Sequence, residues 1–292
     1  MTDSVSTQSA LKHRVLGLPG GRRLTLERPL VMGVLNVTPD SFSDGGRYVD
    51  TEDAVARARE MIAQGADIID IGGESSRPGA EPVSGEEEQR RVIPVIELLR
   101  RETDVPISID TYKSATARAA IDAGADMVND ISALRFDGDM VTLAAQTGVP
   151  VVLMHMLGTP RDMQDNPCYE NCVEEIAAFF AERIAYCENG GIERRQIILD
   201  PGIGFGKRVS DNLEILARLP RFTQFDLPLL VGASRKSFIG KVHSAGTSAD
   251  RRLGGSIAAA VAAVLSGADI VRVHDVAETV EALRVLQAIR ES

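Results

Sequence analysis

The 292-residue sequence predicts an α/β fold, a (β/α)8 barrel (TIM barrel) with a short N-terminal β-hairpin. Eight apolar runs of strand length alternate with segments of helical spacing, and every run ends on a polar or charged residue. A strand buried on both faces should be apolar throughout, so polar residues at the same end of each strand indicate one shared, water-accessible site. The apolar runs cover residues 31–35, 68–71, 107–109, 127–128, 151–154, 197–199, 229–231 and 270–273.

The tripeptide Gly-Ala-Asp occurs three times between a helical segment and a strand, as expected for a barrel of repeated units. Its copies lie at residues 65–67, 124–126 and 267–269. The next polar residue follows each aspartate by three places, at Asp70, Asn129 and Arg272, which implies equal depth in the sheet. An open doubly wound sheet is the alternative, but it usually has fewer strands and binds its ligand at a switch point. A closed barrel fits better, with its active site at the C-terminal ends of the strands.

The segments between the strands have the spacing and caps of helices. Asp50 is the predicted cap of the first, and Ser84 with Glu87 forms a capping-box pattern at the start of the second. The helical segments cover residues 50–64, 84–101, 114–123, 139–147, 168–188, 211–219, 249–266 and 276–289. Because composition does not shift along the chain, we expect a single domain over residues 14–290 after a flexible N-terminal arm over residues 1–13.

A turn signal, Pro-Gly-Gly at residues 19–21, separates two short stretches of alternating apolar residues. The stretches 14–18 and 23–27 therefore predict a β-hairpin ahead of the first barrel strand. We expect this hairpin to close the bottom of the barrel, away from the chemistry.

The segment from Gly254 to Leu265 is apolar on nearly every side. Helices of that kind are buried on two sides. The barrel would cover one side and a second copy of the chain the other, so we expect a homodimer.

Composition narrows the possible partners. The net charge of −10 argues against a nucleic-acid partner, which needs a basic stripe, but leaves room for a small phosphorylated ligand. We expect no membrane partner, because no apolar run approaches the ~20 residues that span a bilayer. The N-terminus lacks the pattern of a secretory signal. The three cysteines are too few for a disulfide framework, so we expect free thiols in the cytoplasm.

Two polar loops follow the first two strands and are longer than plain connectors, as lids commonly are. Asn36 opens the first loop and offers a carbonyl oxygen suited to a hard cation that keeps several waters. The alternative is an ordinary connector that Asn36 caps. In the second loop, over residues 72–79, Ser75, Ser76 and Arg77 can donate to phosphate or carboxylate. Two such loops on neighbouring strands would cover one pocket.

Three acceptor-bearing side chains, Asp110, Asn129 and Asp200, end non-adjacent strands and project into one barrel mouth. Buried carboxylates are costly unless something compensates them, and a ligand rich in N–H groups, such as a guanidine-like heterocycle edge, would do so. Metal binding by two aspartates is the alternative, but no histidine or further carboxylate completes a dedicated cage.

Basic residues follow the last two strands, where phosphate sites of such barrels are frequently built. Ser234-Arg-Lys-Ser237 and Arg272-Val-His274 supply them and predict phosphate or diphosphate binding, with surface salt bridging as the alternative. The glycine-rich run 200–207 lacks the Gly-Lys-Ser/Thr ending of a P-loop. Its glycines instead let Phe205 pass close to a flat ligand. His155 fits a structural role as well as a catalytic one.

Taken together, nine motifs resemble the dihydropteroate synthase family in family order and cover roughly residues 30 to 285. They are Asn-Val-Thr-Pro-Asp-Ser-Phe-Ser-Asp-Gly from Asn36, Gly-Gly-Glu-Ser-Ser-Arg-Pro-Gly from Gly72, Ser-Ile-Asp-Thr around Asp110, Asn-Asp-Ile from Asn129, Leu-Met-His-Met around His155, Asp-Pro-Gly from Asp200, Gly-Phe-Gly-Lys ending at Lys207, Ser-Arg-Lys-Ser from Ser234 and Arg-Val-His-Asp-Val from Arg272. Each motif is weak alone, but nine in order are highly specific.

The resemblance implies a transferase of folate biosynthesis, inhibited by sulfonamides, that condenses 6-hydroxymethyl-7,8-dihydropterin diphosphate with 4-aminobenzoate and requires Mg²⁺. It implies pterin binding by Asp110, Asn129, Asp200 and Lys236. It implies diphosphate binding by Asn36, Arg77, Arg272 and His274, with Mg²⁺ on Asn36. It implies 4-aminobenzoate binding by Ser76, Pro78, Phe205, Lys236 and Ser237. Asp110, Lys236, Arg272 and His274 would be the catalytic residues.

Three alternatives are a pterin-dependent methyltransferase domain, a non-catalytic pterin-binding paralogue and a metal-dependent aldolase barrel. The methyltransferase has no use for a diphosphate site, the paralogue would be expected to lose loop residues, and the aldolase ligands are missing. The chain also departs from the family pattern at Ser76, Leu157 and Ile203, where threonine, a polar residue and an aromatic residue are common. These changes would bear on affinity for 4-aminobenzoate and sulfonamides.

Overall fold

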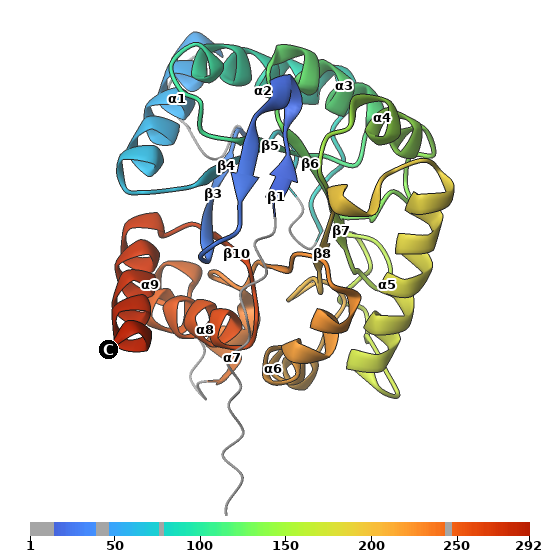
Figure 1. The fold of residues 1–292 in the computed structure, drawn as a ribbon, viewed down its shortest axis with the longest axis vertical. Helices are drawn as coiled ribbons and strands as arrows, with labels where there is room; N and C mark the ends of the chain where they lie inside the picture. Colours follow the sequence, from blue (N-terminus) through green and yellow to red (C-terminus); the bar gives the residue numbers. More distant parts are fainter. Residues whose placement is uncertain (1–14, 39–46, 76–78, 243–246) are drawn as a thin grey trace, which may run out of the picture.

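A computed structural model describes residues 15–38, 47–75, 79–242 and 247–292. Its central sheet has eight parallel strands in the order β8-β7-β6-β5-β4-β3-β10-β9 (Figure 1). A bridge between Leu199 and Leu229 joins the two ends of this order, and the Leu199 amide donates to the Pro228 carbonyl at 2.9 Å. The predicted barrel is therefore confirmed. Its strands are β3 Leu30–Asn36, β4 Ile68–Gly72, β5 Ile107–Asp110, β6 Met127–Asp130, β7 Val151–Met154, β8 Ile197–Asp200, β9 Leu230–Val231 and β10 Ile270–Val273.

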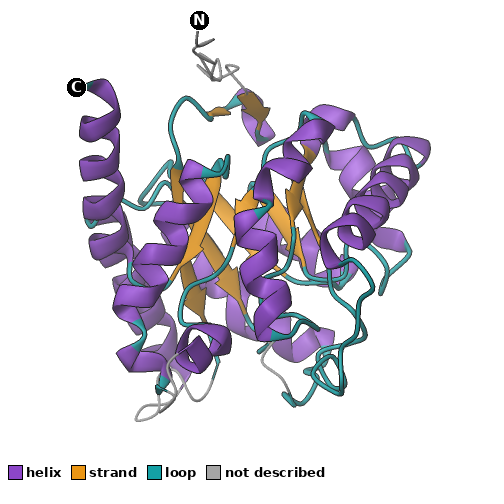
Figure 2. Ribbon diagram, turned by 90° about the horizontal axis from the view of Figure 1, so that it is seen from below, coloured by secondary structure: helices purple, strands orange, loops and turns teal. Residues whose placement is uncertain are grey.

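Helices surround the strands on the outside (Figure 2). They are α1 Arg47–Ala63, α2 Gly85–Arg100, α3 Ser114–Ala123, α4 Asp139–Thr147, α5 Cys172–Asn189, α6 Val209–Ala217, α7 Ser237–Val242, α8 Leu253–Leu265 and α9 Val276–Glu291. The predicted cap of α2 is confirmed, because the Ser84 side chain accepts a hydrogen bond from the Glu87 amide at 3.2 Å.

Some predicted helix bounds are wrong. The segment expected to be helical from residue 168 becomes helical at Cys172, because the Asn171 side chain caps it by accepting from the Glu174 amide. The segment expected over 211–219 ends at Ala217, where a 3-10 turn containing Pro220 follows. The segment expected from residue 249 is a 3-10 turn before it is a helix, and α7 was not predicted.

The barrel interior has an apolar lower layer and a polar upper layer. Side chains of a strand alternate between its faces, so Ile68 and Asp70 of β4 point inward while Ile69 and Ile71 pack against the helices. The lower layer consists of Leu30, Met32, Ile68, Met127, Val152, Ile198, Leu230 and Ile270. Above it, Asp70, Ser108, Asn129, Asp200 and Arg272 occupy inward positions nearer the C-terminal ends of the strands. The sequence thus places polar chemistry at one end of the barrel only.

The predicted hairpin closes the opposite end. Strands β1 (Val15–Gly17) and β2 (Arg23–Thr25) pair antiparallel with Leu16 opposite Leu24. Leu16 and Leu24, together with Leu18 and Leu26, join the apolar cluster of the lower layer, and Figure 2 shows the hairpin at one end of the barrel. The expected plug is confirmed.

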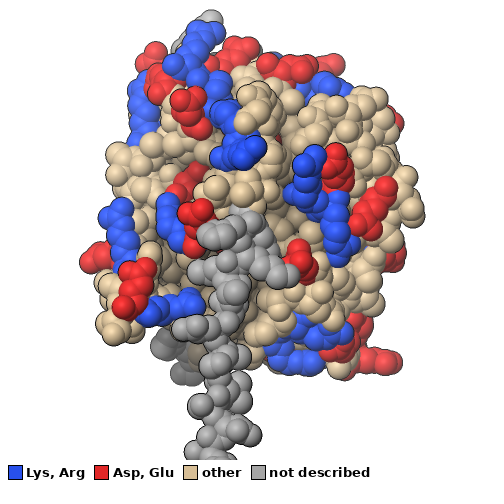
Figure 3. All heavy atoms as spheres, viewed as in Figure 1, with Lys and Arg blue, Asp and Glu red and all other residues tan. Residues whose placement is uncertain are grey.

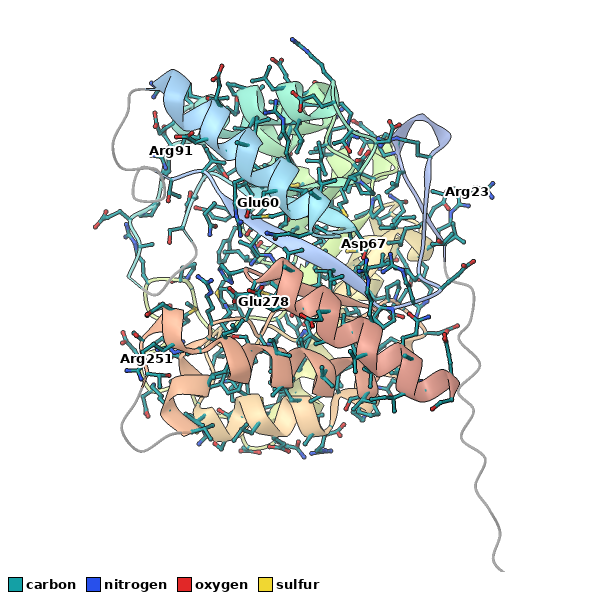
Figure 4. The ribbon with its side chains drawn as sticks, turned by 90° about the vertical axis from the view of Figure 1, so that its left-hand side faces the viewer. Arg23, Glu60, Asp67, Arg91, Arg251 and Glu278 are labelled. Atoms are coloured by element: carbon teal, nitrogen blue, oxygen red, sulfur yellow. The ribbon has the colours of Figure 1, made fainter. Side chains whose placement is uncertain are left out.

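The two ends are easily distinguished in a side view. Arg23 and Asp67 lie toward the hairpin end, and Arg91 and Arg251 lie toward the other (Figure 4). Basic and acidic side chains are interspersed on the hairpin face (Figure 3). Mixed charge of this kind creates no strong single-sign field over the part of this face that the described residues form.

In the part of the chain that the structure describes, no helix is both long enough and apolar enough to cross a membrane.

Truncating the plug should reduce stability without affecting the far end of the barrel. Leu16 is 1% exposed, so Leu16→Ala should lower the free energy of unfolding by about 2–5 kcal/mol. Val15 is 42% exposed on the same strand, so Val15→Ala should change it by less than about 0.5 kcal/mol. Urea unfolding measures both. Equal losses in the two variants would contradict the plug.

Candidate active site at the barrel mouth

Arg272 of β10 is the central side chain of the polar upper layer. Its Nε lies 2.5 Å from Asp70 Oδ2 of β4, and its Nη2 lies 2.6 Å from Asp110 Oδ2 of β5. Burial alone would lower the pKa of Arg272, but the two carboxylates raise it above its ordinary value. The guanidinium is thus a permanent cation that joins two carboxylates across the mouth.

Asp70 extends this network to a third strand. It is fully buried, and the Oδ2 that contacts Arg272 also accepts a hydrogen bond from Asn129 Nδ2 of β6 at 3.0 Å. Asp70, Asn129 and Arg272 are the three residues that follow the Gly-Ala-Asp repeats by equal spacing. The expected equal depth is therefore confirmed by direct contact. No firm role was predicted for Asp70, although this repeat was the signal for one.

Asp110 and Asp200 are buried carboxylates with raised pKa values. Burial raises the pKa of Asp110 to about 7, against the opposing charge of Arg272. Burial likewise raises the pKa of Asp200 to about 6, although its Oδ1 accepts from the Gly202 amide at 2.7 Å. A ligand that donates N–H groups would favour the ionised form of both side chains.

Not every base that follows the last two strands is a cation at the mouth. Burial, together with the charges of Arg272, Arg235 and Lys236, lowers the pKa of His274 to about 3, so this histidine is neutral at pH 7. Its Nδ1 lies 3.1 Å from Ser234 Oγ. Arg235 pairs with Asp275, with Nε 3.0 Å from Oδ2. The charges of Lys236 and Arg272 act on Asp200, and that of Arg272 also acts on Asp110.

Lys236 lies against an aromatic and methionine-rich wall. Its Nζ is 4.0 Å from the centroid of the Phe205 ring. A Cβ on Gly204 would stand 3.1 Å from Lys236 Cδ, so glycine gives the lysine stem room to cross the loop. Phe205 clusters with Ile131, Met154, Met156 and Met163. This wall suits one face of a flat ligand, as the glycine-rich run predicted. Ser237 begins α7 directly after Lys236.

Lys207 and His155 support the loop that carries Phe205. Lys207 Nζ lies 3.0 Å from His155 Nδ1 and donates to the carbonyl oxygens of His155 and Phe205 at 3.2 and 3.0 Å. Burial lowers the pKa of Lys207 to about 7 and keeps the pKa of His155 well below its ordinary value. His155 also stacks edge-on against Phe179. These contacts favour a structural role for His155. No role was predicted for Lys207.

The second loop is anchored beside Asp110. Glu74 Oε1 accepts from the Tyr112 hydroxyl at 2.8 Å, and Oε2 accepts from the Val83 amide at 3.2 Å and pairs with Lys113. A small cavity of about 10 Å³ adjoins this anchor. It is lined by Glu74, Ser75, Glu88, Asp110, Thr111, Tyr112, Ile131 and Pro160. Sequence reasoning missed the anchor, because Tyr112 and Lys113 belong to no motif that suggested chemistry.

The remaining predicted residues divide into two groups. Asn36 ends β3 and pairs in register with Gly72 of β4, so the two loops begin side by side. Ser76, Arg77 and Pro78 lie outside the described residues, as do positions 39–46 of the first loop. Within the described ranges, no group of three or more His, Cys, Asp or Glu side chains is arranged to hold a metal ion. Asp110 and Asp200 instead contact Arg272 and a backbone amide.

The barrel mouth therefore combines hydrogen-bond acceptors, two cations and a flat apolar wall, as a barrel enzyme for an N–H-rich heterocycle requires. Comparison with known proteins agrees. The family model described as pterin binding enzyme matches residues 32–274. The dihydropteroate synthase of Escherichia coli (strain K12) is 53% identical over 268 residues, which are 92% of this chain and 94% of that protein.

Solved structures give the same result. The Xanthomonas albilineans dihydropteroate synthase with 4-aminobenzoic acid is 48% identical, with a TM-score of 0.90 over 96% of this chain and 100% of that one. The same synthase with 7,8-dihydropteroate has a TM-score of 0.85 at 47% identity, over 93% and 97%. The Yersinia pestis synthase in a sulfonamide drug complex has a TM-score of 0.89 at 47% identity, over 95% and 100%. The chain belongs to the dihydropteroate synthase family of pterin-binding enzymes.

Removing the central cation should destabilise the protein in a pH-dependent way. Arg272→Met leaves Asp70 and Asp110 without their guanidinium, which should cost about 3–5 kcal/mol at pH 8. The pKa of Asp110, already about 7, should rise further. A native carboxyl with a raised pKa binds more protons than the unfolded chain, so stability falls as pH rises through that window, and the loss should be smaller at pH 5.5.

Urea unfolding at the two pH values measures this difference. Arg235→Met is the matched control, because Arg235 pairs with Asp275 and is 39% exposed. The loss of unfolding free energy in Arg235→Met should be small and nearly the same at pH 5.5 and pH 8. A pH-independent loss in Arg272→Met would contradict the assigned charge balance.

Proposed function

We propose that this chain condenses 6-hydroxymethyl-7,8-dihydropterin diphosphate with 4-aminobenzoate, giving 7,8-dihydropteroate and diphosphate in folate biosynthesis. The supporting observation is the polar upper layer, in which acceptors from β5, β6 and β8 lie beside Arg272 in one barrel mouth. Membership of the dihydropteroate synthase family makes the enzyme a transferase.

The pterin is bound by its N–H edge. Asp110, Asn129 and Asp200 supply carboxylate and amide oxygens to the amino group and ring N–H, and Lys236 donates to the carbonyl side. Because Asp110 and Asp200 titrate near pH 7 and 6, an N–H-rich ligand lowers their pKa values and gains from ionising them. The electrostatic gain comes from placing donors where water has been excluded.

The diphosphate is bound by Arg272, Arg77 and a neutral His274. The backbone amide of His274 donates to Ser234 Oγ at 3.2 Å, so the Ser234 hydroxyl is oriented to donate to Nδ1. The histidine proton then resides on Nε2, where it can be donated to a phosphate oxygen. A neutral donor avoids adding a third cation beside Arg272 and Lys236, whose charges keep the pKa of His274 low.

The reaction needs a stabilised leaving group more than a nucleophilic side chain. The C–O bond to diphosphate breaks with its electron pair on the leaving oxygen, and the methylene carbon becomes cationic in conjugation with the pterin. The amine of 4-aminobenzoate forms the new C–N bond and loses a proton to solvent. Arg272 and His274 stabilise the departing charge. Ser76, Pro78, Phe205, Lys236 and Ser237 hold the amine near the carbon.

Mg²⁺ is the proposed cofactor, with Asn36 as its protein ligand. Asn36 fits this ion because it ends β3 with an amide oxygen, at the base of both loops and one strand from β10. Mg²⁺ typically keeps several waters and binds substrate phosphates through few protein ligands. When bound, the ion neutralises diphosphate charge.

Two further proposals concern assembly and location. Leu265 of α8 is 60% exposed, and Val285 and Ile289 of α9 are 55% and 66% exposed. Because α8 and α9 lie side by side (Figure 1), these side chains support a homodimer through this face. The cysteines Cys168, Cys172 and Cys187 are free, which supports a reducing cytoplasm.

Metal removal tests the role of Asn36. Excess EDTA should abolish dihydropteroate formation, and added Mg²⁺ should restore it. Asn36→Ala should raise the Mg²⁺ concentration for half-maximal rate by about tenfold or more, because a ligand is lost. Asn189→Ala, at the far end of α5, should leave the Mg²⁺ requirement unchanged. An unaltered Mg²⁺ requirement in Asn36→Ala would move the metal site elsewhere.

The reaction itself is tested with purified chain, Mg²⁺ and both substrates, by measuring dihydropteroate and diphosphate together. Lys236→Ala should lower kcat/KM by about 100-fold or more, because a positioned cation beside the pterin and Phe205 is lost. Lys241→Ala is the control, because Lys241 lies exposed in the last turn of α7, and it should keep the wild-type rate. No product from the wild-type chain would favour the non-catalytic paralogue.

A further inference from the structure

One contact in the barrel mouth conflicts with the roles proposed for its two partners. Asp110 binds the pterin edge and Arg272 binds the diphosphate, yet Arg272 Nη2 donates to Asp110 Oδ2 at 2.6 Å. While the two residues are paired, Asp110 Oδ2 and the Nη2 proton that it accepts are both withheld from the substrate. An exchange of partners, with a pterin N–H replacing Nη2 on Asp110, would release both groups.

The other contact of the guanidinium does not need to change. Asp70 is 0% exposed, so it cannot touch the substrate, and its Oδ2 accepts from Arg272 Nε at 2.5 Å. Arginine presents its donors in a rigid fork, so Nη2 moves only when the whole guanidinium moves. A pivot of the whole group about its Nε–H contact with Asp70 would turn Nη2 away from Asp110 and keep the guanidinium in place.

The same oxygen of Asp70 also orients Asn129. A carboxylate only accepts hydrogen bonds, so Asn129 must turn Nδ2 toward Asp70, as the 3.0 Å contact shows. The Asn129 carbonyl oxygen is then the atom left for the pterin. Asp70 thus orients Asn129, the proposed acceptor of the pterin subsite, and Arg272, the proposed cation of the diphosphate subsite.

Stability alone does not account for this carboxylate. Among the described residues, Asp70 Oδ1 has no hydrogen-bond partner, and neither has Oγ of Ser108, its register partner on β5. A buried polar atom without a partner destabilises the folded state. An apolar residue would suit the position better if only packing mattered.

We propose that Asp70 is a positioning residue, which holds Arg272 by Nε while Nη2 passes from Asp110 to the diphosphate as the pterin binds. The inference rests on the proposed function. The exchange makes the pterin and diphosphate subsites cooperative. A pterin that donates to Asp110 in place of Arg272 leaves Nη2 available to the diphosphate. Asp70 preserves this exchange by keeping the guanidinium between the two subsites.

Cooperativity can be measured without turnover. Two probes, 6-hydroxymethylpterin and inorganic diphosphate with Mg²⁺, are titrated into the full chain by calorimetry, each with and without the other. In the wild-type chain, saturating pterin should tighten diphosphate binding by about fivefold or more. In Asp70→Asn the factor should fall to about one. Asp70→Asn with the wild-type coupling factor would overturn the proposal.

Kinetics provide a second measurement. Asp70→Asn should lower kcat/KM for the pterin diphosphate by about 100-fold, the scale of a misplaced catalytic group. The KM for 4-aminobenzoate should stay within about threefold, because that subsite is formed by other residues. A purely structural role predicts no such selectivity, so equal effects on both substrates would also overturn the proposal.

The control is a buried carboxylate at the other end of the barrel. Asp126 is 0% exposed and pairs with Arg100 at 2.6 Å, so Asp126→Asn should lose stability but keep coupling and rate. If Asp70→Asn does not fold, Arg272→Lys replaces it, because a single ammonium cannot stay on Asp70 and also reach the diphosphate. Retained coupling in Arg272→Lys would refute the exchange.

These outcomes are separable from failure of the proposed function. If the wild-type chain makes no dihydropteroate, the synthase activity fails. The coupling between the two probes still decides whether Asp70 links their subsites, because calorimetry requires no reaction.

Discussion

The charge balance around Arg272 is the interaction on which the barrel mouth depends. Burying carboxylates is costly, and the cost is met only when a cation or a set of donors compensates them. Here one guanidinium contacts both Asp70 and Asp110 across strands that are not neighbours of β10. The proposed pterin would be a second source of donors for carboxylates that this guanidinium satisfies only in part.

The fold was predictable because the positions of polar residues within the strands repeat so regularly. Polar residues recur at the same end of each predicted strand. Asp70, Asn129 and Arg272 also stand at equal spacing after their Gly-Ala-Asp repeats, which places them at the same depth in a closed sheet. The hairpin followed from its turn signal and alternation. Helix ends were less predictable, because the start of α5 depends on a side-chain cap at Asn171 rather than on periodicity.

The site was only partly predictable for a different reason. Sequence motifs identify which residues meet at the mouth but not which atoms contact each other. The pairing of Arg272 with Asp110 joins residues 162 positions apart, and no local pattern encodes it. The same limit hid the neutrality of His274, whose low pKa arises from burial and from Arg272, Arg235 and Lys236 around it. Lys207 was missed because its partners are carbonyl oxygens, which leave no trace in side-chain identity.

The separation of the two ends explains how such an unfavourable charge arrangement is tolerated. The apolar lower layer and the leucines of the hairpin bury a continuous core beneath the polar layer. That core supplies stability at the end where nothing reacts. The upper layer can then hold carboxylates whose pKa values lie near neutrality and, among the described residues, an Asp70 oxygen without a hydrogen-bond partner. The apolar lower layer thus offsets the cost of burying polar groups at the mouth.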